Sequence, residues 1–418
     1  MPDVVVIGAG VVGAACAFYA ARAGLSVVVV DQGTVAGGTT GAGEGNVLVS
    51  DKEPGPELDL ALLSSGLWAE LAVAVGGFEY EPKGGLVVAE TPEVLTALTG
   101  LAAKQESSGV RAAVVDPEEY EPHIARGLAG GVHYPQDAQV QPMLAAARLL
   151  RASGAEVRTG VRVTGFARSG DRVTGVRTDA GDLRAGAVVN AAGTWAGDVA
   201  ALAGINLPVL PRRGFILVTE PLPEPLIRHK VYTAAYVTNV ASEDEGLETS
   251  AVVEGTPAGT ILIGASRERV GYDRNIAYPV LARLAEQAIA LFPALAGRQA
   301  IRAYCGFRPY CPDHLPVIGP DPRAPGLYHA TGHEGAGIGL APATGLLISQ
   351  LLTSSSGQLG SSDRPGPSSR FSTSSGSDPS GGPGPFAESS ESGGLGESGM
   401  SGDRLDIDLF PFRPERFA

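Results

Sequence analysis

Cysteine is scarce in this sequence, which holds only Cys16, Cys305 and Cys311 among its 418 residues. No two of them form a CxxC pair, and an odd number cannot be fully paired. This spacing argues against a disulfide framework and against a structural zinc site, so we expect no bound metal. Such cysteine usage is typical of a reducing compartment, and we expect a cytoplasmic protein.

Long apolar runs and positive charge are also lacking. No uninterrupted apolar segment is long enough to span a bilayer, and no basic leader precedes the first apolar run, so we expect neither a membrane span nor export. Acidic residues outnumber basic ones by 45 to 31, and the net charge of −14 argues against nucleic acid or an anionic membrane as a partner. A length of 418 residues exceeds one compact core, so we expect two packed domains.

Glycine, by contrast, is abundant, with 58 residues, and its most informative cluster lies near the N-terminus. Residues 4–31 read VVVIGAGVVGAACAFYAARAGLSVVVVD, the layout of a dinucleotide-binding βαβ unit. Gly8 permits the tight turn, Gly10 lets backbone N–H groups approach a pyrophosphate, and Gly13 lets the helix pack closely on the strand. Asp31 would accept hydrogen bonds from a ribose, whereas an ordinary glycine-rich turn would leave this acid unexplained.

The rest of the chain predicts an α/β protein whose first domain is assembled from separate pieces. An apolar strand at 187–189 leads into the small residues 190–193 as a second return to the nucleotide sheet, and strand-like runs between 209 and 263 predict an antiparallel sheet. Serine, glycine and proline dominate residues 353–402, which we expect to be a disordered insertion. The tail at 403–418 is expected to dock on the folded body through Leu405, Ile407, Leu409 and Phe410.

Four motifs occur in a fixed order: the N-terminal fingerprint, VVNAAGTWA, GFRPYCPDHLPVIG and GHEGAGIGLAPATG. With these motifs the chain resembles the D-amino-acid-oxidase-like family of FAD-dependent oxidoreductases, which includes glycine and sarcosine oxidases, D-hydroxyproline dehydrogenases and the flavin subunits of hydrogen cyanide synthases. The resemblance covers residues 4–352 and the tail from about 403, and it implies FAD rather than NAD. It also implies a two-domain α/β fold, with a discontinuous FAD-binding Rossmann-type domain from residues 1–80, 143–205 and 300–352, and an α+β substrate domain with an antiparallel sheet from 81–142 and 206–299.

The same resemblance implies the cofactor-binding residues. The turn from Thr39 would reach the pyrophosphate, the segment at Gly45 would pass the flavin ring, and Val163 would meet the adenine. Backbone N–H groups at 337–340, just before the last helix, could stabilise negative charge on the flavin. Cys305 lies one position out of register with the cysteine that attaches FAD in sarcosine oxidases, so non-covalent FAD is expected. The full set is Gly8, Gly10, Val11, Val12, Gly13, Asp31, Gln32, Thr39, Thr40, Gly41, Ala42, Gly45, Asn46, Val163, Ala192, Gly193, Trp195, Gly306, Arg308, Gly335, Gly337, Ile338, Gly339 and Leu340.

Arg308 is the residue that the resemblance assigns to the substrate carboxylate. It follows Cys305–Gly306–Phe307, in the segment where family members acting on amino acids place an arginine. A guanidinium offers a carboxylate two charge-assisted hydrogen bonds. The alternative is an arginine tied to Asp313 or to a carbonyl.

Two departures from glycine oxidases bear on the substrate. Glu334 stands in the turn where those enzymes carry a second arginine, and residues 251–253 read AVV where they supply a substrate-binding tyrosine. Tyr232 or Tyr236, from the excursion at 228–250, could reach over the site instead or pack as core residues. A larger or N-substituted amino acid therefore fits better than glycine.

His333 completes the set of catalytic candidates. It could act as a base, although structural hydrogen bonding within its turn is the favoured interpretation. The candidates are thus Arg308, Tyr236, Tyr232 and His333.

The resemblance implies oxidation of a carbon–nitrogen bond in a small amino acid or N-substituted amino acid. A hydride would pass from the substrate carbon to flavin N5, and water would hydrolyse the resulting imine to a keto acid or aldehyde. Two alternatives stay open: biosynthetic cleavage of an N-substituted glycine that releases glyoxylate, and a flavin subunit of a heteromeric dehydrogenase that passes electrons to a partner. The electron acceptor is then O2 or a partner protein, and an oligomer is compatible with the sequence.

Overall fold

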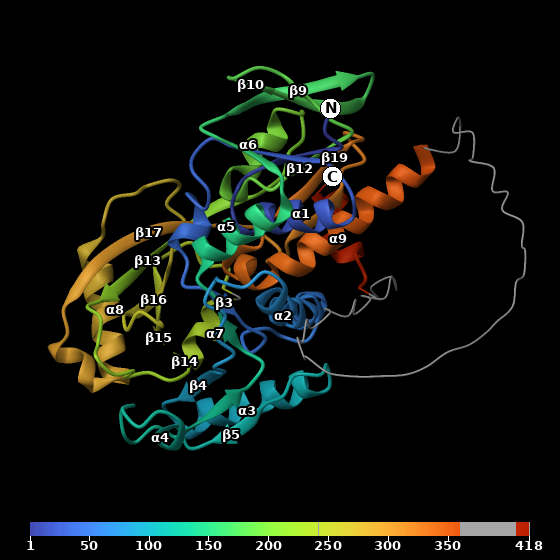
Figure 1. The fold of residues 1–418 in the computed structure, drawn as a ribbon. Helices are drawn as coiled ribbons and strands as arrows, with labels where there is room; N and C mark the ends of the chain where they lie inside the picture. The colour runs from blue at the N-terminus through green and yellow to red at the C-terminus, as the bar shows by residue number, and fades with distance from the viewer. Residues whose placement is uncertain (241, 360–406, 418) are drawn as a thin grey trace, which may run out of the picture. The chain divides into compact units, whose positions relative to one another are not determined.

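A computed structural model of the chain describes residues 1–240, 242–359 and 407–417. Residues 1–354 and the tail from 407 form one compact unit, which contains two large β-sheets (Figure 1). Residues 355–406 form a second unit, of which only the helical turns at 355–359 are described.

The first large sheet has six strands and contains the N-terminal fingerprint. In sheet order the strands are β18 (Val317–Pro320), β19 (Leu327–Thr331), β12 (Ala187–Asn190), β1 (Val4–Ile7), β2 (Val27–Asp31) and β8 (Glu156–Thr159). The five strands from β19 to β8 run parallel, and β18 adds an antiparallel edge. Because both faces of a parallel sheet are covered, its strands are continuous apolar runs, which explains the valines of β1 and β2.

The second large sheet has eight strands and was expected to be antiparallel. In order the strands are β17 (Ala300–Tyr310), β13 (Leu210–Thr219), β16 (Ile261–Arg267), β15 (Glu248–Gly255), β14 (Lys230–Thr233), β4 (Gly85–Ala89), β6 (Gly130–Tyr134) and β5 (Ala113–Val115). All neighbours pair antiparallel except β14 and β4, which pair in parallel. The pairing of β17 with β13 places residues 300–310 in this sheet, which corrects their assignment to the FAD-binding domain.

Two small sheets complete the β-structure. They contain β9 (Val163–Ser169), β10 (Arg172–Thr178) and β11 (Leu183–Arg184) in one, and β3 (Asn46–Val47) and β7 (Ala138–Gln139) in the other.

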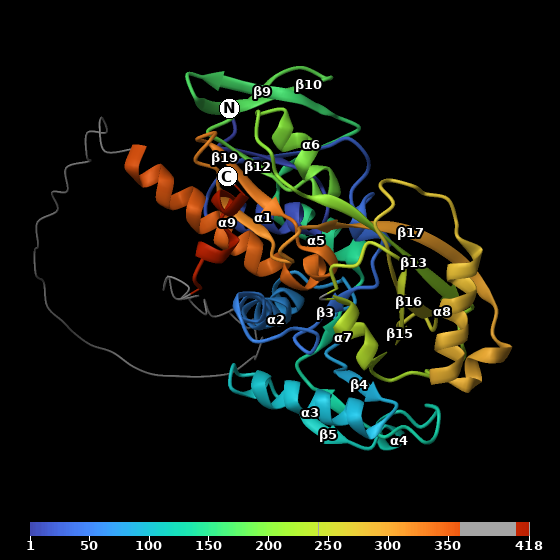
Figure 2. The ribbon, with the colours of Figure 1, turned by 180° about the vertical axis from the view of Figure 1, so that it is seen from behind.

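The helices cover both large sheets. They are α1 (Val11–Arg22), α2 (Pro56–Ala74), α3 (Pro92–Glu106), α4 (Pro117–Tyr120), α5 (Pro142–Ser153), α6 (Ala196–Ala201), α7 (Ala234–Val240), α8 (Tyr278–Leu291) and α9 (Gly337–Leu359), with short 3₁₀ turns η1 (Thr39–Ala42), η2 (Gly193–Trp195), η3 (Pro293–Gly297), η4 (Glu334–Ala336), η5 (Phe410–Phe412) and η6 (Pro414–Phe417). α1 packs beside α5 near the first sheet, whereas α8 packs on β13, β15 and β16 of the second and α3 packs on β4 and β6 (Figure 2).

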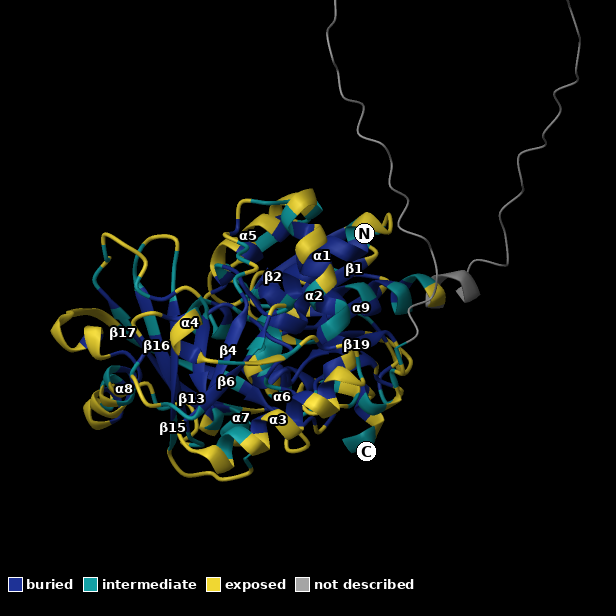
Figure 3. Cartoon of the chain, turned by 90° about the horizontal axis from the view of Figure 1, so that it is seen from below, coloured by how far each residue is buried: buried dark blue, intermediate teal, exposed yellow. Residues whose placement is uncertain are grey.

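Each large sheet has a hydrophobic core of its own. One cluster joins β1, β2 and β12 to α6 and the three-stranded sheet, and includes Val5, Val188 and Leu327. The other joins β4, β13, β15 and β16 to α8, and includes Phe215 and Leu284. Figure 3 shows the central strands of both sheets buried and the outer faces of the helices exposed, whereas the edge strands β8 and β5 and the start of β17 are partly exposed. The two cores support the two-domain division that we propose from the sequence.

Helix α9 is longer than the sequence analysis expected. It extends to Leu359, so the expected disorder boundary at 353 falls inside the helix, while residues 360–402 lie outside the described part of the chain. The segment Glu334–Ser354 is also long and apolar enough to cross a membrane by length and composition, contrary to expectation, but 61% of that window is buried in the protein. Close packing accounts for this composition, since a Cβ on Gly345 would lie 2.6 Å from the backbone of Ala15 in α1.

The described tail, residues 407–417, docks on the body as expected but through a different anchor. Phe412 is fully buried, whereas Phe410 is 71% exposed, and Leu405 lies outside the described residues. The turns η5 and η6 pack against β18. Arg416 Nε also pairs with Asp313 Oδ2 at 2.5 Å.

Candidate active site

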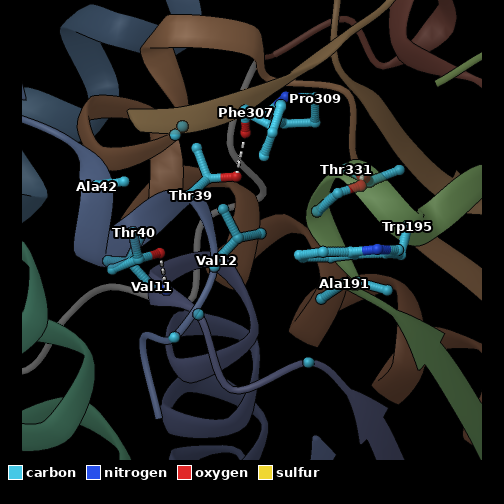
Figure 4. A pocket seen from close by; sticks show the side chains of 18 of the residues that line it. Val11, Val12, Thr39, Thr40, Ala42, Ala191, Trp195, Phe307, Pro309 and Thr331 are labelled. Carbon is cyan, nitrogen blue, oxygen red and sulfur yellow. Dashed lines mark hydrogen bonds between the residues drawn. The ribbon is translucent and has the colours of Figure 1, made fainter. Parts of the chain in front are cut away.

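A cavity of about 890 Å³ lies where the first sheet meets the second. Its wall includes Ile7, Val30 and Ala191, at the carboxyl ends of parallel strands, and Gly214 and Gly306 on β13 and β17 (Figure 4). The carboxyl ends of strands are the edge at which open α/β sheets bind ligands.

The glycines of the fingerprint remove side chains at the close contacts of this cavity. Gly8 has a φ of +112°, and a Cβ there would lie 2.3 Å from the carbonyl oxygen of Ala191. A Cβ on Gly13 would lie 2.0 Å from the carbonyl oxygen of Gly8, so Gly13 is needed for packing α1 on β1. The turn and the helix start are therefore set by backbone alone, and the first N–H groups of α1 have no acceptors within the helix.

Two threonines of η1 connect the fingerprint to β17. Thr40 Oγ1 accepts a hydrogen bond from the backbone N–H of Val11 at 3.0 Å, and Thr39 Oγ1 donates one to the carbonyl oxygen of Phe307 at 2.5 Å (Figure 4). The turn η1, which we expect near the pyrophosphate, thus connects by hydrogen bonds the start of α1 and β17, the strand that contains Arg308.

Asp31 has backbone partners on both carboxylate oxygens. Oδ2 accepts from the N–H of Ala9 and Oδ1 from the N–H of Gly33, each at 2.7 Å. Each carboxylate oxygen has two lone pairs, and Asp31 lines the cavity, so it can still accept hydrogen bonds from a ligand.

Arg308 lies on the cavity wall and is not tied to an acid. Its Nη1 donates to the carbonyl oxygen of Ser266 at 2.9 Å, and no carboxylate among the described residues pairs with it. Of the two alternative partners considered above, Asp313 pairs instead with Arg416 of the tail, whereas a carbonyl, that of Ser266, does bind Arg308. Most of the guanidinium's donors are therefore available to a ligand.

Comparison with known proteins identifies the family. The model of the DAO family, FAD dependent oxidoreductase, matches residues 3–351. The chain belongs to this family. The hydrogen cyanide synthase subunit HcnC of Pseudomonas aeruginosa is 31% identical over 84% of this chain and 92% of its own length, and the glycine oxidase of that organism is 31% identical over 84% and 94%. A solved glycine oxidase from Geobacillus kaustophilus has a TM-score of 0.77 and 27% identity, covering 84% of this chain and 95% of its own.

The DAO-family assignment confirms the resemblance, the fold class and FAD as the cofactor. The fingerprint end of the cavity suits the ADP half of FAD, because Gly8 and Gly10 line it without side chains, the first turn of α1 has N–H groups without acceptors in the helix, and Asp31 lines the cavity. Within the described residues, no group of three or more His, Cys, Asp or Glu side chains could hold a metal ion.

The structure brings most of the sequence-predicted residues of this DAO-family chain to one cavity. The lining includes Gly8, Gly10, Val11, Val12, Asp31, Gln32, Thr39, Thr40, Ala42, Gly45, Asn46, Val163, Ala192, Gly193, Trp195, Tyr236, Gly306, Arg308, His333, Gly335, Gly337 and Ile338. Five predicted residues lie outside the lining: Gly13, Gly41, Tyr232, Gly339 and Leu340. Gly13 and Gly41 permit close backbone packing, and Leu340 is a core residue.

Glu334 replaces an arginine of the glycine oxidases, and the structure gives it partners. Arg212 Nη1 donates to Glu334 Oε1 at 2.7 Å, and His314 Nδ1 lies 3.0 Å from Oε2. Burial favours a higher pKa for this carboxyl, yet the hydrogen bond from His314 and the charge of Arg212 hold the pKa of Glu334 below its ordinary value. Glu334 is therefore an ionised carboxylate on the cavity wall, and the positive charge of Arg212 balances its negative charge.

Of the two tyrosine candidates, only Tyr236 lines the cavity. Tyr232 is fully buried on β14, and its hydroxyl hydrogen-bonds with the hydroxyl of Ser50, so it does not reach the cavity. Tyr236 lies in the first turn of α7, lines the cavity and packs its ring edge-on against Tyr232. The guanidinium of Arg267 lies 5.2 Å from the ring centroid of Tyr236. Tyr236 is thus the tyrosine of the pair that can contact a ligand.

His333 lines the cavity but is bound structurally. Its Nε2 lies 2.9 Å from the hydroxyl of Thr344 in α9, while Nδ1 is buried without a partner. Burial lowers the pKa of His333 to about 3. This geometry agrees with the structural role that was favoured, since a neutral imidazole of such low basicity is a poor proton acceptor.

Besides Glu334, five charged residues at the site are absent from the set predicted from the sequence. Glu44, Arg162, Asp198 and Arg274 line the cavity, and Arg267 is buried beside the ring of Tyr236. Glu44 is the only charged residue between Asp31 and Asp51, and that isolation was the signal that could have found it.

Proposed function

We propose that the protein oxidises the carbon–nitrogen bond of a small amino acid or N-substituted amino acid. The observation that supports this most is the guanidinium of Arg308, which has no carboxylate partner among the described residues and faces the same cavity as the dinucleotide fingerprint. A carboxylate-bearing substrate supplies that partner. The DAO-family relatives include a glycine oxidase and a hydrogen cyanide synthase subunit, which favours amino acids as the substrate class.

FAD would be held by the fingerprint, by η1 and by the turn before α9. Bound FAD supplies the acceptor for a hydride from the substrate carbon. Cys305 does not line the cavity, whereas residues 306–309 of the same strand do. This placement supports non-covalent binding.

The residues of the protein act by positioning the substrate. Arg308 would hold the carboxylate, and Tyr236, from the same cavity wall, would contact the rest of the substrate. Fixing the reacting carbon in this way supplies the orientation on which the reaction rate depends. Oxidation leaves an imine, which water then hydrolyses to a keto acid or aldehyde.

A second candidate is the oxidative cleavage of an N-substituted glycine. Arg267 is 3% exposed, and no carboxylate among the described residues pairs with it. Burial and the nearby charge of Arg308 lower the pKa of Arg267 to about 10. Arg267 does not line the cavity, but its positive charge beside Tyr236 adds to that of Arg308. This favours a substrate with a second negative charge, such as an N-carboxymethyl amino acid, whose oxidation would release glyoxylate.

Anaerobic mixing of the FAD-loaded protein with a panel of amines tests both candidates. The panel contains D- and L-amino acids, prolines, N-alkyl glycines and N-carboxymethyl amino acids. Bleaching of the flavin absorbance identifies the substrate, and the carbonyl product separates glyoxylate release from simple deamination. If no member of the panel bleaches the flavin, the proposed function is wrong. Peroxide formed during aerobic turnover distinguishes O2 from a partner protein as the electron acceptor.

The pH dependence of this reduction is a further expected result. Because the reacting amine must be unprotonated, the reduction rate constant should rise with pH to an alkaline plateau. Since burial holds the pKa of His333 near 3, its imidazole stays neutral over this range. His333→Gln, which retains a group able to reach Thr344, should therefore leave the shape of the profile unchanged. A profile that loses an ionisation in the variant would make His333 the base.

A further inference from the structure

Glu44 carries an unused carboxylate oxygen beside the cavity. Glu44 is one of the residues that line the cavity, it is only 8% exposed, and its buried Oε1 has no hydrogen-bond partner. The other oxygen, Oε2, accepts from Lys230 Nζ at 3.2 Å and from Asn46 Nδ2 at 3.1 Å. An unsatisfied buried carboxylate oxygen is costly, so its presence at a cavity points to a donor supplied by a ligand.

The charges around Glu44 do not balance. Lys230 is buried between two acids, with Nζ 3.2 Å from Glu44 and 2.5 Å from Glu254. Two carboxylates and one ammonium leave a formal charge of −1 in a site where all three residues are at least nine-tenths buried. Glu254 also has an oxygen without a partner, but it does not line the cavity. Of Glu44, Lys230 and Glu254, only Glu44 lines the cavity, so its carboxylate is the one that can interact with a positively charged group of a ligand.

A patch of bare backbone separates Glu44 from Arg308. Gly214 on β13 pairs with Gly306 on β17, and Ile216 on β13 neighbours Gly264 on β16. A Cβ on Gly214 would lie 2.3 Å from Arg308 Nη1, and a Cβ on Gly264 would lie 2.2 Å from Glu44 Oε1. Arg308 Nη1 and Glu44 Oε1 thus each lie against a glycine of two neighbouring strands, β13 and β16.

A guanidinium and a carboxylate on the wall of one cavity complement the two ends of an α-amino acid, which carries a carboxyl group and an amine on one carbon. A substrate held this way has its amine directed toward Glu44 and its carboxylate toward Arg308.

We propose that Glu44 is the amine-recognition residue of this site, with Oε1 accepting a hydrogen bond from the N–H of a primary or secondary amino acid. This inference rests on the proposed function and adds to it the direction in which the substrate lies. It also predicts that the site prefers amino acids to carboxylates that lack an N–H. Such carboxylates cannot hydrogen-bond with Glu44 and lie next to its negative charge. Glu44 positions the substrate and transfers no proton in this proposal.

Ligand binding tests this proposal without turnover. The probes are 2-aminoisobutyrate, which has no hydrogen on its α-carbon and cannot be oxidised there, and isobutyrate, which lacks the amine. Their dissociation constants are measured by the change in flavin absorbance of the FAD-loaded protein. The wild type should bind 2-aminoisobutyrate about 10- to 100-fold more tightly than isobutyrate, as expected for one hydrogen bond to a charged group. Glu44→Gln should lose most of this preference while binding isobutyrate equally well or better.

Glu254→Gln is the matched control, because it removes the other acid from Lys230 and leaves Glu44 at the cavity. It should keep most of the preference for the amine. An equal loss in Glu254→Gln would show that Glu44, Lys230 and Glu254 act through folding and would overturn the proposal. If Glu44→Gln is unstable, Glu44→Asp keeps the charge but withdraws the oxygens by one methylene, and it should reduce the preference as well.

Further outcomes of the same binding measurements would overturn the proposal. An unchanged ratio of the two dissociation constants in Glu44→Gln overturns the proposal, as does a wild type that binds the two probes equally. A Glu44→Gln variant with altered FAD affinity and an unchanged ratio would assign Glu44 to the cofactor instead. The amine panel described above reports separately on the proposed function, since flavin bleaching in the wild type does not depend on Glu44→Gln.

Discussion

Arg308→Ala is expected to lower kcat/KM for the substrate by about a hundredfold to ten-thousandfold. The estimate follows from losing two charge-assisted hydrogen bonds, worth about 1.5–3 kcal/mol each. The guanidinium is held in place by one bond to the carbonyl oxygen of Ser266 and has no acid partner among the described residues, so the folded state has little to lose. The concentration dependence of anaerobic flavin reduction measures the effect.

Arg302→Ala is the matched control for this prediction. Arg302 lies six residues earlier on β17, is exposed, and packs over the ring of Tyr304 away from the cavity. It should reduce the flavin at the wild-type rate. An Arg308→Ala protein that keeps its FAD and its substrate affinity would show that the carboxylate is bound elsewhere.

Gly8→Ala is expected to yield protein that does not retain FAD. Gly8 has a φ of +112°, and its new Cβ would lie 2.3 Å from the carbonyl oxygen of Ala191, so either the turn or β12 must move. Both flank the site at which the phosphates would bind. The ratio of flavin to protein absorbance after purification measures retention, and thermal unfolding shows whether the fold survives.

Gly24→Ala is the control that distinguishes the backbone strain of a positive φ from the steric clash expected in Gly8→Ala. Gly24 has a φ of +85° after α1, but a Cβ there would meet nothing within 4 Å. It carries the conformational cost of a left-handed alanine, about 1 kcal/mol, without the clash. It should therefore bind FAD normally. Equal loss of flavin in both variants would mean that the cause is general instability.

The sequence predicted the first sheet well because its information is local. A continuous valine run, a glycine turn and an alanine-rich helix lie within residues 4–31, and the structure shows β1, α1 and β2 there. The position of β17 could not be read in the same way. Its pairing with β13 joins residues about ninety apart, and nothing in its own residues distinguishes the two sheets.

The site residues that belong to a sequence motif could be predicted. The residues that come together only through contacts between distant parts of the chain could not. Tyr232 and Tyr236 are four residues apart, and the sequence could not choose between them because β14 ends and α7 begins between them. Glu44 became a candidate only through Lys230, which lies 186 residues away in the chain. Arg267 likewise gains its setting from Tyr236 and Arg308, on other elements of the fold.

The glycines at 214, 264 and 306 have a consequence for engineering this enzyme. Each sits where an added methyl group would collide with Arg308, Glu44 or Ala42. Substitution at these three positions is consequently restricted, and directed evolution toward bulkier amines should enrich changes at the cavity-lining residues Ile216 and Tyr236 and leave the three glycines untouched.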